Sequence, residues 1–510
     1  MSEETQDPQQ SEPPAGERER RVGKLEALRA AGIEPYPVRF DPTASLAEIR
    51  GQYGSLEAGV STGVVVSAAG RLVARRGHGK LVFAVLREGD AEMQIMASED
   101  VLGEQGLAAF GDLDLGDWVG VRGEVVSSRR GELSIKAERA QLIGKSLRPL
   151  PDKWHGLRDV EVRYRQRHVD LTVNPAARHV LAVRSAVVRA LREHLEARGF
   201  IEVETPMLQR MAGGAAARPF VTHHNALDMD LYLRIAPELY LKRLIAGGMG
   251  RVYELNRTFR NEGISVRHNP EFTMLEAYQA YTDYHGMLEL TQGLVRAAAL
   301  AACGTLSITY QGEEMDLSAD FRKVTMLESV TEATGVGFDY AMPLEEARRR
   351  CEALEVPFDA CFGVGKLVVE VFEKYVESNL VQPTFVLDYP IEVSPLARRH
   401  RSDPYVAERF ELIVAGRELA NAFSELVDPL DQRERFEAQA RAKAAGDEEA
   451  MSVDEDYLAA LEFGMPPCGG LGIGVDRLAM LLADVPSIRD VILFPLLRPE
   501  GSGDPAAPQD

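Results

Sequence analysis

The sequence predicts an α+β protein in which a small β-barrel precedes a larger domain of mixed helices and strands. Its 510 residues are enough for at least two domains, each with a core of its own. Short β-rich runs, separated by glycines and charged residues, recur between residues 60 and 146, and their density suggests a barrel of the OB type. After residue 155 the pattern changes to a long amphipathic helix and longer strand-like runs.

Composition and charge exclude several classes of protein. The chain has 58 basic and 79 acidic side chains, a formal net charge of −21, and 45% hydrophobic residues. No apolar run approaches the ~20 residues that a membrane helix requires, and residues 1–20 lack the apolar segment of a secretion signal. The four cysteines form no CxxC pair, so we expect neither structural zinc nor disulfides, and a cytoplasmic location. The acidic average still allows a local basic patch that binds phosphate.

Changes in composition predict the domain boundaries. The predicted segments are a disordered extension (1–16), a helical segment (17–59), the barrel (60–148), a linker (149–177), a second domain (178–498) with a helical insertion at about 340–380, and a flexible tail (499–510). The second domain opens with apolar residues at helical spacing from 180 to 195, followed by a strand-like segment, 200–206, that ends in proline. Further strand-like runs at 251–260 and 272–281 flank a polar loop.

This polar loop concentrates charge that suits a phosphate group. Arg260, Glu262, Arg267 and His268 lie close together in it. Guanidinium groups present several donors in one plane and keep their charge, as phosphate binding requires. A generic charged loop is more often a solvated hairpin tip, but hairpin loops usually have about 2–5 residues, and this loop is longer.

A glycine-rich strand leads directly into a helix near residue 475. Gly470, Gly472 and Gly474 alternate with apolar residues, and Asp476 and Arg477 begin the helix. The segment is not a Walker loop, because no GK[ST] follows, and its GxGxG spacing without a βαβ unit is not a dinucleotide fingerprint. Alone, it favours tight strand packing over a ligand site.

Acidic residues after position 410 are spaced as in a hairpin. A tight turn at Ala415-Gly416 would place Glu411 and Glu418 roughly opposite each other, where Mg²⁺ with phosphate oxygens would relieve their repulsion. Two solvent-facing acids on an edge strand are an equally good interpretation. Alternating positions then share one face of the next strand: Asn421, Phe423 and Glu425.

A second group of acids predicts a cationic ligand. Glu276 and Tyr278 share one face of the strand after the polar loop, and Glu238 lies in the segment Arg234-Ile-Ala-Pro-Glu-Leu-Tyr. If Glu238, Glu276 and Glu425 converge, the pocket is anionic. Buried acids without a partner are costly, so a bound ammonium group would compensate them.

Together these segments resemble the three signature motifs of the class II aminoacyl-tRNA synthetases, and the resemblance covers nearly the whole chain. Motif 1, the dimer-interface element, resembles residues 200–206, motif 2 resembles 259–262 with 268–272, and motif 3 resembles 472–477. The closest resemblance is to the lysyl branch. It is carried by residues 150–157, 163–167, 213–220 and 421–426, and by Glu276 with Tyr278.

This resemblance implies an OB-fold that binds the anticodon, followed by a catalytic antiparallel sheet flanked by helices. It implies a two-step ligase reaction. L-lysine and ATP give lysyl-adenylate and pyrophosphate, and the lysyl group then passes to the 3′ end of tRNA(Lys). It also implies Mg²⁺ as the cofactor and a homodimer.

The resemblance assigns roles to residues of this sequence. The ATP-binding residues are Arg260, Glu262, His268, Phe272 and Arg477, of which Arg260 and Arg477 are catalytic. The lysine-binding residues are Gly214, Glu238, Glu276, Tyr278, Asn421, Phe423 and Glu425, and Glu411 and Glu418 hold the metal. Arg260 is expected to bridge the α-phosphate and the lysine carboxylate, and Phe272 and Arg477 to sandwich the adenine. Glu276, Glu425 and Tyr278 are expected to hold the ε-ammonium.

The barrel carries the candidate tRNA contacts: Arg71, Arg75, Arg76, Phe83 and Gln94. An aromatic ring beside an amide suits stacking on anticodon bases and reading them, although Phe83 could equally belong to the barrel core. Two departures from the family pattern stand out. Ala420 and Ala422 replace glycines expected around Asn421, and residues 86–90 lack the usual Gln-Asp.

Other functions are consistent with parts of this pattern. A paralogue that lysylates another acceptor would be expected to lack the barrel or to carry membrane helices. A non-catalytic tRNA-binding descendant should have lost Arg260, Arg477, Glu411 or Glu418, all of which are present. An aspartyl enzyme would need a cationic pocket, whereas Glu276 and Glu425 predict an anionic one.

Overall fold

The computed structural model describes residues 16–77, 79–151, 157, 159–215, 217–444 and 450–499. Nearly all of the predicted extension and tail lie outside these residues, as do residues 152–156 of the predicted linker. The chain divides into two compact units, Met1–Asp159 with His168–Pro175, and Val160–Arg167 with Ala176–Asp510. The first is called here the barrel unit and the second the sheet unit.

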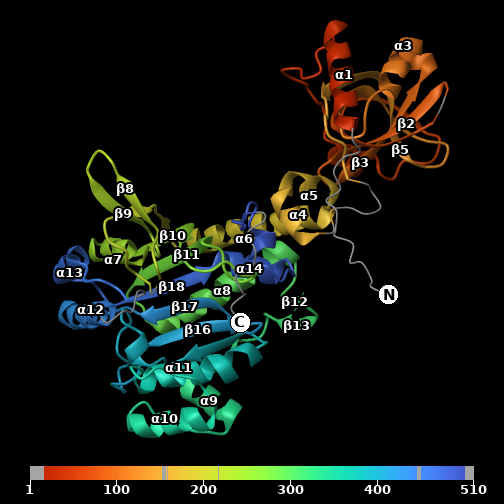
Figure 1. Cartoon of the computed structure of the whole chain (residues 1–510). Helices are drawn as coiled ribbons and strands as arrows, with labels where there is room; N and C mark the ends of the chain where they lie inside the picture. Colours follow the sequence, from red (N-terminus) through yellow and green to blue (C-terminus); the bar gives the residue numbers. More distant parts are fainter. Residues whose placement is uncertain are drawn as a thin grey trace, which may run out of the picture. The chain divides into compact units, whose positions relative to one another are not determined.

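The described residues of the barrel unit include a closed barrel of five strands in the order β1-β2-β3-β5-β4 (Figure 1). The strands are β1 (Ser61–Arg76), β2 (Leu81–Glu88), β3 (Ala91–Ser98), β4 (Trp118–Ser127) and β5 (Leu133–Gly144). The helices around them are α1 (Glu17–Ala30), α2 (Leu46–Tyr53) and α3 (Glu99–Gly111). The predicted barrel is therefore confirmed; α1 and α2 lie in the predicted helical segment 17–59, whereas α3 was not predicted.

Alternation along β2 shows which side chains fill the barrel. Val82, Ala84 and Leu86 are buried in its core, whereas Phe83 is only half-buried. Successive strand residues point to opposite sides, so Phe83 lies on the outer side of β2. The alternative that Phe83 is a core residue is therefore excluded.

The sheet unit is built on an eight-stranded sheet of order β14-β15-β16-β17-β18-β11-β10-β6 (Figure 1). Its strands are β6 (Ile201–Glu202), β10 (Arg251–Phe259), β11 (Glu271–Ala280), β14 (Arg322–Thr325), β15 (Thr384–Leu387), β16 (Arg409–Val414), β17 (Arg417–Ser424) and β18 (Cys468–Gly474). The β14–β15 and β6–β10 pairs are parallel and the other pairs antiparallel. The expected antiparallel sheet thus has a parallel pair at each end.

Smaller strands and several helices complete this unit. The strands β7 (Leu208–Gln209), β8 (Val221–His224) and β9 (Met229–Leu233) form a small sheet, and β12 (Ser307–Tyr310) pairs with β13 (Glu313–Asp316). The helices are α4 (Val160–Arg165), α5 (Arg167–Val173), α6 (Pro175–Glu196), α7 (Glu238–Ala246), α8 (Tyr284–Cys303), α9 (Met326–Thr334), α10 (Leu344–Ala353), α11 (Val364–Tyr375), α12 (Pro429–Ala444), α13 (Glu455–Glu462), α14 (Val475–Leu482) and α15 (Ile488–Val491), of which α5 falls largely in the barrel unit. No helix in the described part of the chain is long and apolar enough to span a membrane.

The two faces of the large sheet differ in chemistry. One face packs against α6, α8 and α14, and its strands contribute residues such as Leu275, Ala422 and Ile473 to a common hydrophobic core. The alternate residues of the same strands point to the opposite face. Because charged and small side chains occupy that face, a ligand can lie directly on the sheet.

Three local predictions differ from the structure. The strand expected at 200–206 is reduced to Ile201–Glu202, which pairs in parallel with β10. The predicted linker is helical from Val160, where Arg167 is buried and donates to carbonyl groups of residues 489–493. The helices of the predicted insertion, α10 and α11, belong with α9 to the crossover between β14 and β15, since parallel strands require a long connection.

Candidate active site

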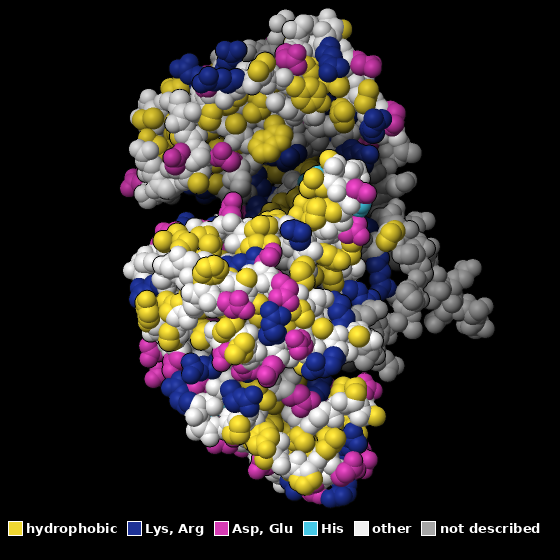
Figure 2. Space-filling model, turned by 90° about the vertical axis from the view of Figure 1, so that its left-hand side faces the viewer, with side chains coloured by type: hydrophobic (Ala, Val, Ile, Leu, Met, Phe, Trp, Pro, Cys, Tyr) yellow, Lys and Arg dark blue, Asp and Glu magenta, His cyan; other side chains and the backbone are white. Residues whose placement is uncertain are grey.

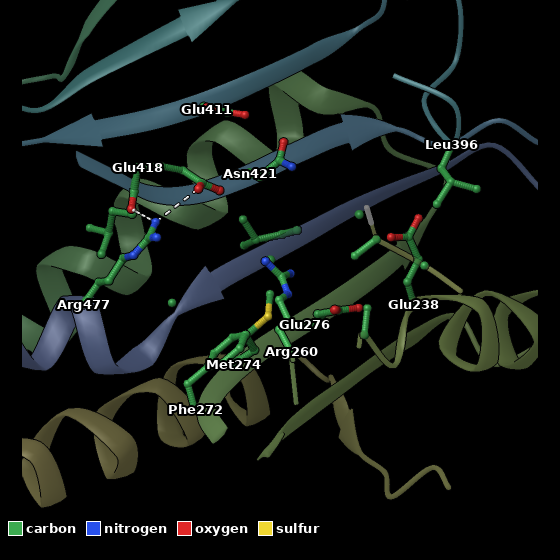
Figure 3. A pocket seen from close by; sticks show the side chains of 18 of the residues that line it. Glu238, Arg260, Phe272, Met274, Glu276, Leu396, Glu411, Glu418, Asn421 and Arg477 are labelled. Atoms are coloured by element: carbon green, nitrogen blue, oxygen red, sulfur yellow. Dashed lines mark hydrogen bonds and ion pairs between the residues drawn. The ribbon is translucent and has the colours of Figure 1, made fainter. Parts of the chain in front are cut away.

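A cavity of about 410 Å³ lies on the open face of the large sheet. It is lined by β11, β17 and β18, by the loop between β10 and β11, and by the start of α7. Figure 3 shows Arg477 and Glu418 at one end, Glu238 at the other, and Arg260 between them. Residues separated by more than 260 positions in the sequence therefore meet in one pocket.

Strand register explains why the pocket has room for a ligand. Glu276 on β11, Gly472 on β18, Asn421 on β17 and Glu411 on β16 are consecutive partners across four strands. Glycine in the middle of this row leaves the space between the flanking polar side chains empty. The glycines of β18 thus form the floor of the pocket, whereas the sequence alone favoured tight packing.

The loop between β10 and β11 brings Arg260 and Phe272 together. The Arg260 backbone N–H donates to the Pro270 carbonyl at 2.9 Å, and the Arg260 guanidinium lies 5.3 Å from the Phe272 ring centroid. The Nε of Arg260 is buried and has no hydrogen-bond partner among the described residues. Glu262 and His268 line the same pocket from exposed positions of the loop.

Arg477 begins α14 and faces β17 rather than Phe272. Its Nη1 donates to the backbone carbonyl of Glu418 at 2.6 Å and lies 3.1 Å from the Glu418 carboxylate (Figure 3). The expected sandwich has both of its walls in the pocket, but in this structure Arg260, not Arg477, stacks on Phe272. Burial raises the pKa of Glu418, but Arg477, Arg260 and Arg409 outweigh it and lower that pKa below its usual value.

The hairpin prediction for Glu411 and Glu418 is correct for the turn and wrong for the register. Ala415 and Gly416 both have positive φ, as a tight hairpin turn requires. Glu411 pairs with Asn421, and Glu418 pairs with Ile413.

The turn at Ala415-Gly416 by itself places Glu418 opposite Ile413, and a β-bulge at Leu419 then moves Glu411 by one position to face Asn421. Leu419 and Ala420 are adjacent, and both are buried in the hydrophobic core. The extra residue reverses the alternation, so Glu418 joins Asn421 on the pocket side.

Arg409 joins Glu411 to Asn421 on the pocket side of this strand pair. Its guanidinium donates to Glu411 at 2.6 Å and to the Asn421 side-chain oxygen at 3.0 Å. Burial raises the pKa of Glu411 to about 7, against the lowering effect of Arg409. Among the described residues no group of three or more His, Cys, Asp or Glu side chains could hold a metal ion.

The far end of the pocket holds the predicted lysine-binding residues. Gly214 has a φ of +90°, and a Cβ there would lie 3.1 Å from the Cβ of Glu238. The Tyr278 hydroxyl donates to Glu276 at 3.1 Å. Burial and the neighbouring Glu238 raise the pKa of Glu276 to about 8, so this acid favours a nearby cation strongly.

Glu425 is fully buried behind the pocket wall rather than in its lining. It forms an ion pair with Lys242, which also lies 2.5 Å from Glu238. A Cβ on Gly470 would come within 1.9 Å of Glu425 Oε1, so the carboxylate reaches the pocket at this glycine. Phe423 lines the pocket, and its ring centroid is 5.2 Å from Lys242 Nζ.

Sequence reasoning missed Lys242 and Arg409. Lys242 follows Glu238 by four positions, a spacing that predicts a pair on one helix face. Arg409 precedes Glu411 by two positions and so shares its strand face. Ala420 and Ala422, which depart from the family pattern, face the hydrophobic core rather than the substrate side.

The barrel residues expected to contact tRNA are distributed over β1 to β3. Arg71 lies over Trp118 and donates to the Gly116 carbonyl, and burial lowers its pKa. Arg75 and Arg76 are exposed on β1; Arg75 donates to a backbone carbonyl, and the Arg76 guanidinium lies 5.7 Å from the Phe83 ring centroid.

Gln94 is buried within the barrel wall. Its side chain donates to Ser134 at 2.9 Å and accepts from Arg76 at 3.1 Å. These two bonds use one amide hydrogen and one lone pair of the oxygen, and they fix the orientation of the Gln94 amide.

Comparisons with known proteins agree with this architecture. A family model described as tRNA synthetases class II (D, K and N) matches residues 159–498. A second model, described as an OB-fold nucleic acid binding domain, matches residues 66–143. The chain belongs to the class II aminoacyl-tRNA synthetases.

Individual relatives show to which family within this class the chain belongs. A lysine–tRNA ligase of Carboxydothermus hydrogenoformans is 54% identical over 479 residues, covering 94% of this chain and 97% of the relative. The lysine–tRNA ligase of Thermosynechococcus vestitus is 54% identical over 489 residues, covering 95% and 97%. Within its class, the chain is a member of the lysine–tRNA ligase family.

Proposed function

We propose that this protein ligates L-lysine to tRNA(Lys) in two steps, first forming lysyl-adenylate and pyrophosphate from lysine and ATP. One observation carries the proposal. A single pocket joins an arginine-lined end suited to phosphates with an anionic end suited to ammonium groups. Lysine has an ammonium group at each end of its chain, so both substrates fit one continuous site.

At the arginine-lined end, positioning and charge supply the catalysis. Arg260 neutralises the α-phosphate and the lysine carboxylate, and its buried Nε is available for this because it lacks a partner among the described residues. The lysine carboxylate attacks the α-phosphorus in line with the departing pyrophosphate. Phe272 and Arg477 enclose the adenine, and Glu262 and His268 contact the nucleotide from the loop.

At the anionic end, the acids recognise lysine. Gly214 and Glu238 hold the α-ammonium, and the positive φ of Gly214 allows the close approach. Glu276, Tyr278 and Glu425 hold the ε-ammonium. Asn421 and Phe423 orient the substrate from β17.

Glu411 and Glu418 have the chemistry of a magnesium site. Both are carboxylates on the pocket side, and burial of Glu411 favours a neighbouring cation. Mg²⁺ is commonly held by one or two carboxylates together with substrate phosphates and water. An Mg²⁺ ion held there would supply positive charge to the phosphates, and Arg409 and Arg477 would then be available to contact the substrate.

We infer that the protein acts in the cytoplasm as a homodimer and binds tRNA through its barrel. Figure 2 views the side of the β8–β9 hairpin, where hydrophobic side chains gather. Ile201, Leu208, Val221 and Leu227 are exposed on and near this small sheet, as a dimer surface requires. In the barrel, the exposed Arg76 and the Phe83 ring beside it suit a phosphate and a stacked anticodon base.

The test is ATP–pyrophosphate exchange by the full chain with Mg²⁺, measured against each of the twenty amino acids. Exchange with lysine alone, followed by charging of tRNA(Lys), is the expected result. Exchange with another amino acid would overturn the lysine assignment. Exchange with lysine but no transfer to tRNA(Lys) would indicate a different acceptor.

A further inference from the structure

A buried lysine side chain lies among the acids of the proposed lysine site. Lys242 is fully buried on α7, with its Nζ 2.5 Å from Glu238 and in an ion pair with Glu425. Burial lowers the pKa of Lys242, but these two carboxylates outweigh it and raise that pKa well above its usual value. The charged form of this side chain is therefore favoured, and no step proposed above uses it.

Other charged groups next to this cluster are already paired. Arg234 and Glu254, both buried, lie 2.6 Å apart. Arg409 and Glu411 form a second pair, also at 2.6 Å. The charge of the lysine site is thus set by three acids, Glu238, Glu276 and Glu425, against the single cation Lys242.

This balance leaves two negative charges. Lysine brings two ammonium groups, and its carboxylate is opposed by Arg260, so the loaded site is neutral when every group is ionised. Oε2 of Glu425 is paired with Lys242, whereas Oε1, which is also buried, has no hydrogen-bond partner among the described residues. Such an acceptor is incomplete until a further donor arrives.

We propose that Lys242 is a positioning and specificity-determining residue. Its positive charge balances one of the three buried acids of the pocket, so that the remaining two negative charges are balanced by a substrate with two ammonium groups. The inference rests on the proposed function. Without Lys242, the loaded site would carry an uncompensated negative charge or retain a proton on one of the acids. An amino acid with a neutral side chain would leave a buried carboxylate unpaired in the same way.

The test is a double-mutant cycle on lysine-dependent ATP–pyrophosphate exchange, using Lys242→Met, Glu425→Gln and the double variant. Each single change unbalances the site, and we expect the KM for lysine to rise about 100-fold in each, with the KM for ATP within about threefold. The double variant restores neutrality, because two acids then face two ammonium groups. Its KM for lysine should be lower than that of either single variant, at about tenfold above the unchanged protein.

A matched control is Lys366→Met, which removes a half-exposed i,i+4 pair with Glu370 on α11, outside the pocket lining. It should leave the KM for lysine unchanged. If Lys242→Met does not fold, the comparison of Glu425→Gln with the double variant still decides, because only charge matching predicts improvement by the second mutation. A double variant no better than Glu425→Gln overturns the inference, whereas absence of lysine-dependent exchange in the unchanged protein overturns the proposed function instead.

Discussion

In the barrel unit, Lys145 is buried with Asp114 and Asp117, whereas in the sheet unit Lys242 is buried with Glu238 and Glu425. Both clusters place one lysine between two acids. In the barrel, both oxygens of Asp117 also accept backbone N–H groups, from Asp114 and Ser146, at 2.8 Å. In the sheet unit, Oε2 of Glu425 pairs with Lys242, and Oε1 has no hydrogen-bond partner among the described residues.

This difference indicates that the Lys145 cluster stabilises the fold, whereas the Lys242 cluster has an acceptor left over for a ligand. Burial raises the pKa of Asp114, but hydrogen bonds from Lys145 and Arg20 outweigh it and hold that pKa well below its usual value. Burial raises the pKa of Glu425 well above its usual value, against the lowering effect of Lys242. A complete hydrogen-bond set keeps an acid ionised inside a protein, and an incomplete set leaves it in need of a further cation.

The largest effect is expected from breaking the barrel cluster. Asp117→Asn leaves Lys145 with one acid fewer, and we expect the free energy of unfolding to fall by about 3–5 kcal/mol. Urea denaturation followed by the fluorescence of Trp118, the next residue, measures this loss. Lysine-dependent exchange should stay unchanged under native conditions, and the exposed Asp41→Asn variant is the control. A stable Asp117→Asn protein would remove the distinction between the two clusters.

Breaking the sheet-unit cluster should have the opposite signature. Glu425→Gln removes an acid whose charged form burial disfavours and leaves Lys242 paired with Glu238, so it should lose less stability than Asp117→Asn, while the KM for lysine rises about 100-fold, or about 3 kcal/mol. Steady-state exchange at varied lysine and varied ATP measures the two KM values separately. The exposed Glu434→Gln variant on α12 controls for the loss of one charge. Equal damage to lysine and ATP use would contradict the assignment.

The raised pKa of Glu276 makes lysine binding at the sheet-unit cluster dependent on pH. Glu276, with a pKa of about 8, is protonated in the empty pocket at lower pH and must lose its proton to pair with an ammonium group. The Kd for lysine should therefore fall as pH rises from about 6.5 to about 8, by at most about tenfold per unit, and level off above. Calorimetry in buffers of different ionisation enthalpy counts the released proton. Glu276→Gln should bind lysine weakly and without this pH dependence.

The smallest effect is expected on the surface of the barrel. Arg76→Ala removes an exposed guanidinium that stacks on Phe83, and we expect the KM for tRNA(Lys) to rise about fivefold. Lysine-dependent exchange without tRNA should not change. Arg39→Ala, which removes an exposed arginine elsewhere in the barrel unit, separates a local contact from the general effect of charge. An equal loss in both variants would argue against a specific contact at Arg76.

Much of the site could be predicted because its parts are local in sequence. The alternation of glycines with Leu471 and Ile473 fixes which side of β18 faces the pocket, and Glu276 and Tyr278 share a face by the same rule. The bulge at Leu419 could not be predicted, because it depends on core packing against other elements. Because of the bulge, the Glu418 side chain points to the pocket side of β17. Strict alternation from Asn421 would place it on the opposite face of the strand.

By itself, the sequence determined the class of each segment: the barrel strands, the charged loop, the tight hairpin turn, and the acids that make the pocket anionic. These features depend on near neighbours along the chain, where spacing and turn chemistry act directly. Only the tertiary structure decided which charges meet. Whether the hydrogen bonds of a buried acid are all satisfied depends on donors from distant segments. Lys145 and Ser146 both donate to Asp117, whereas Lys242 pairs with Oε2 of Glu425 and Oε1 has no partner among the described residues.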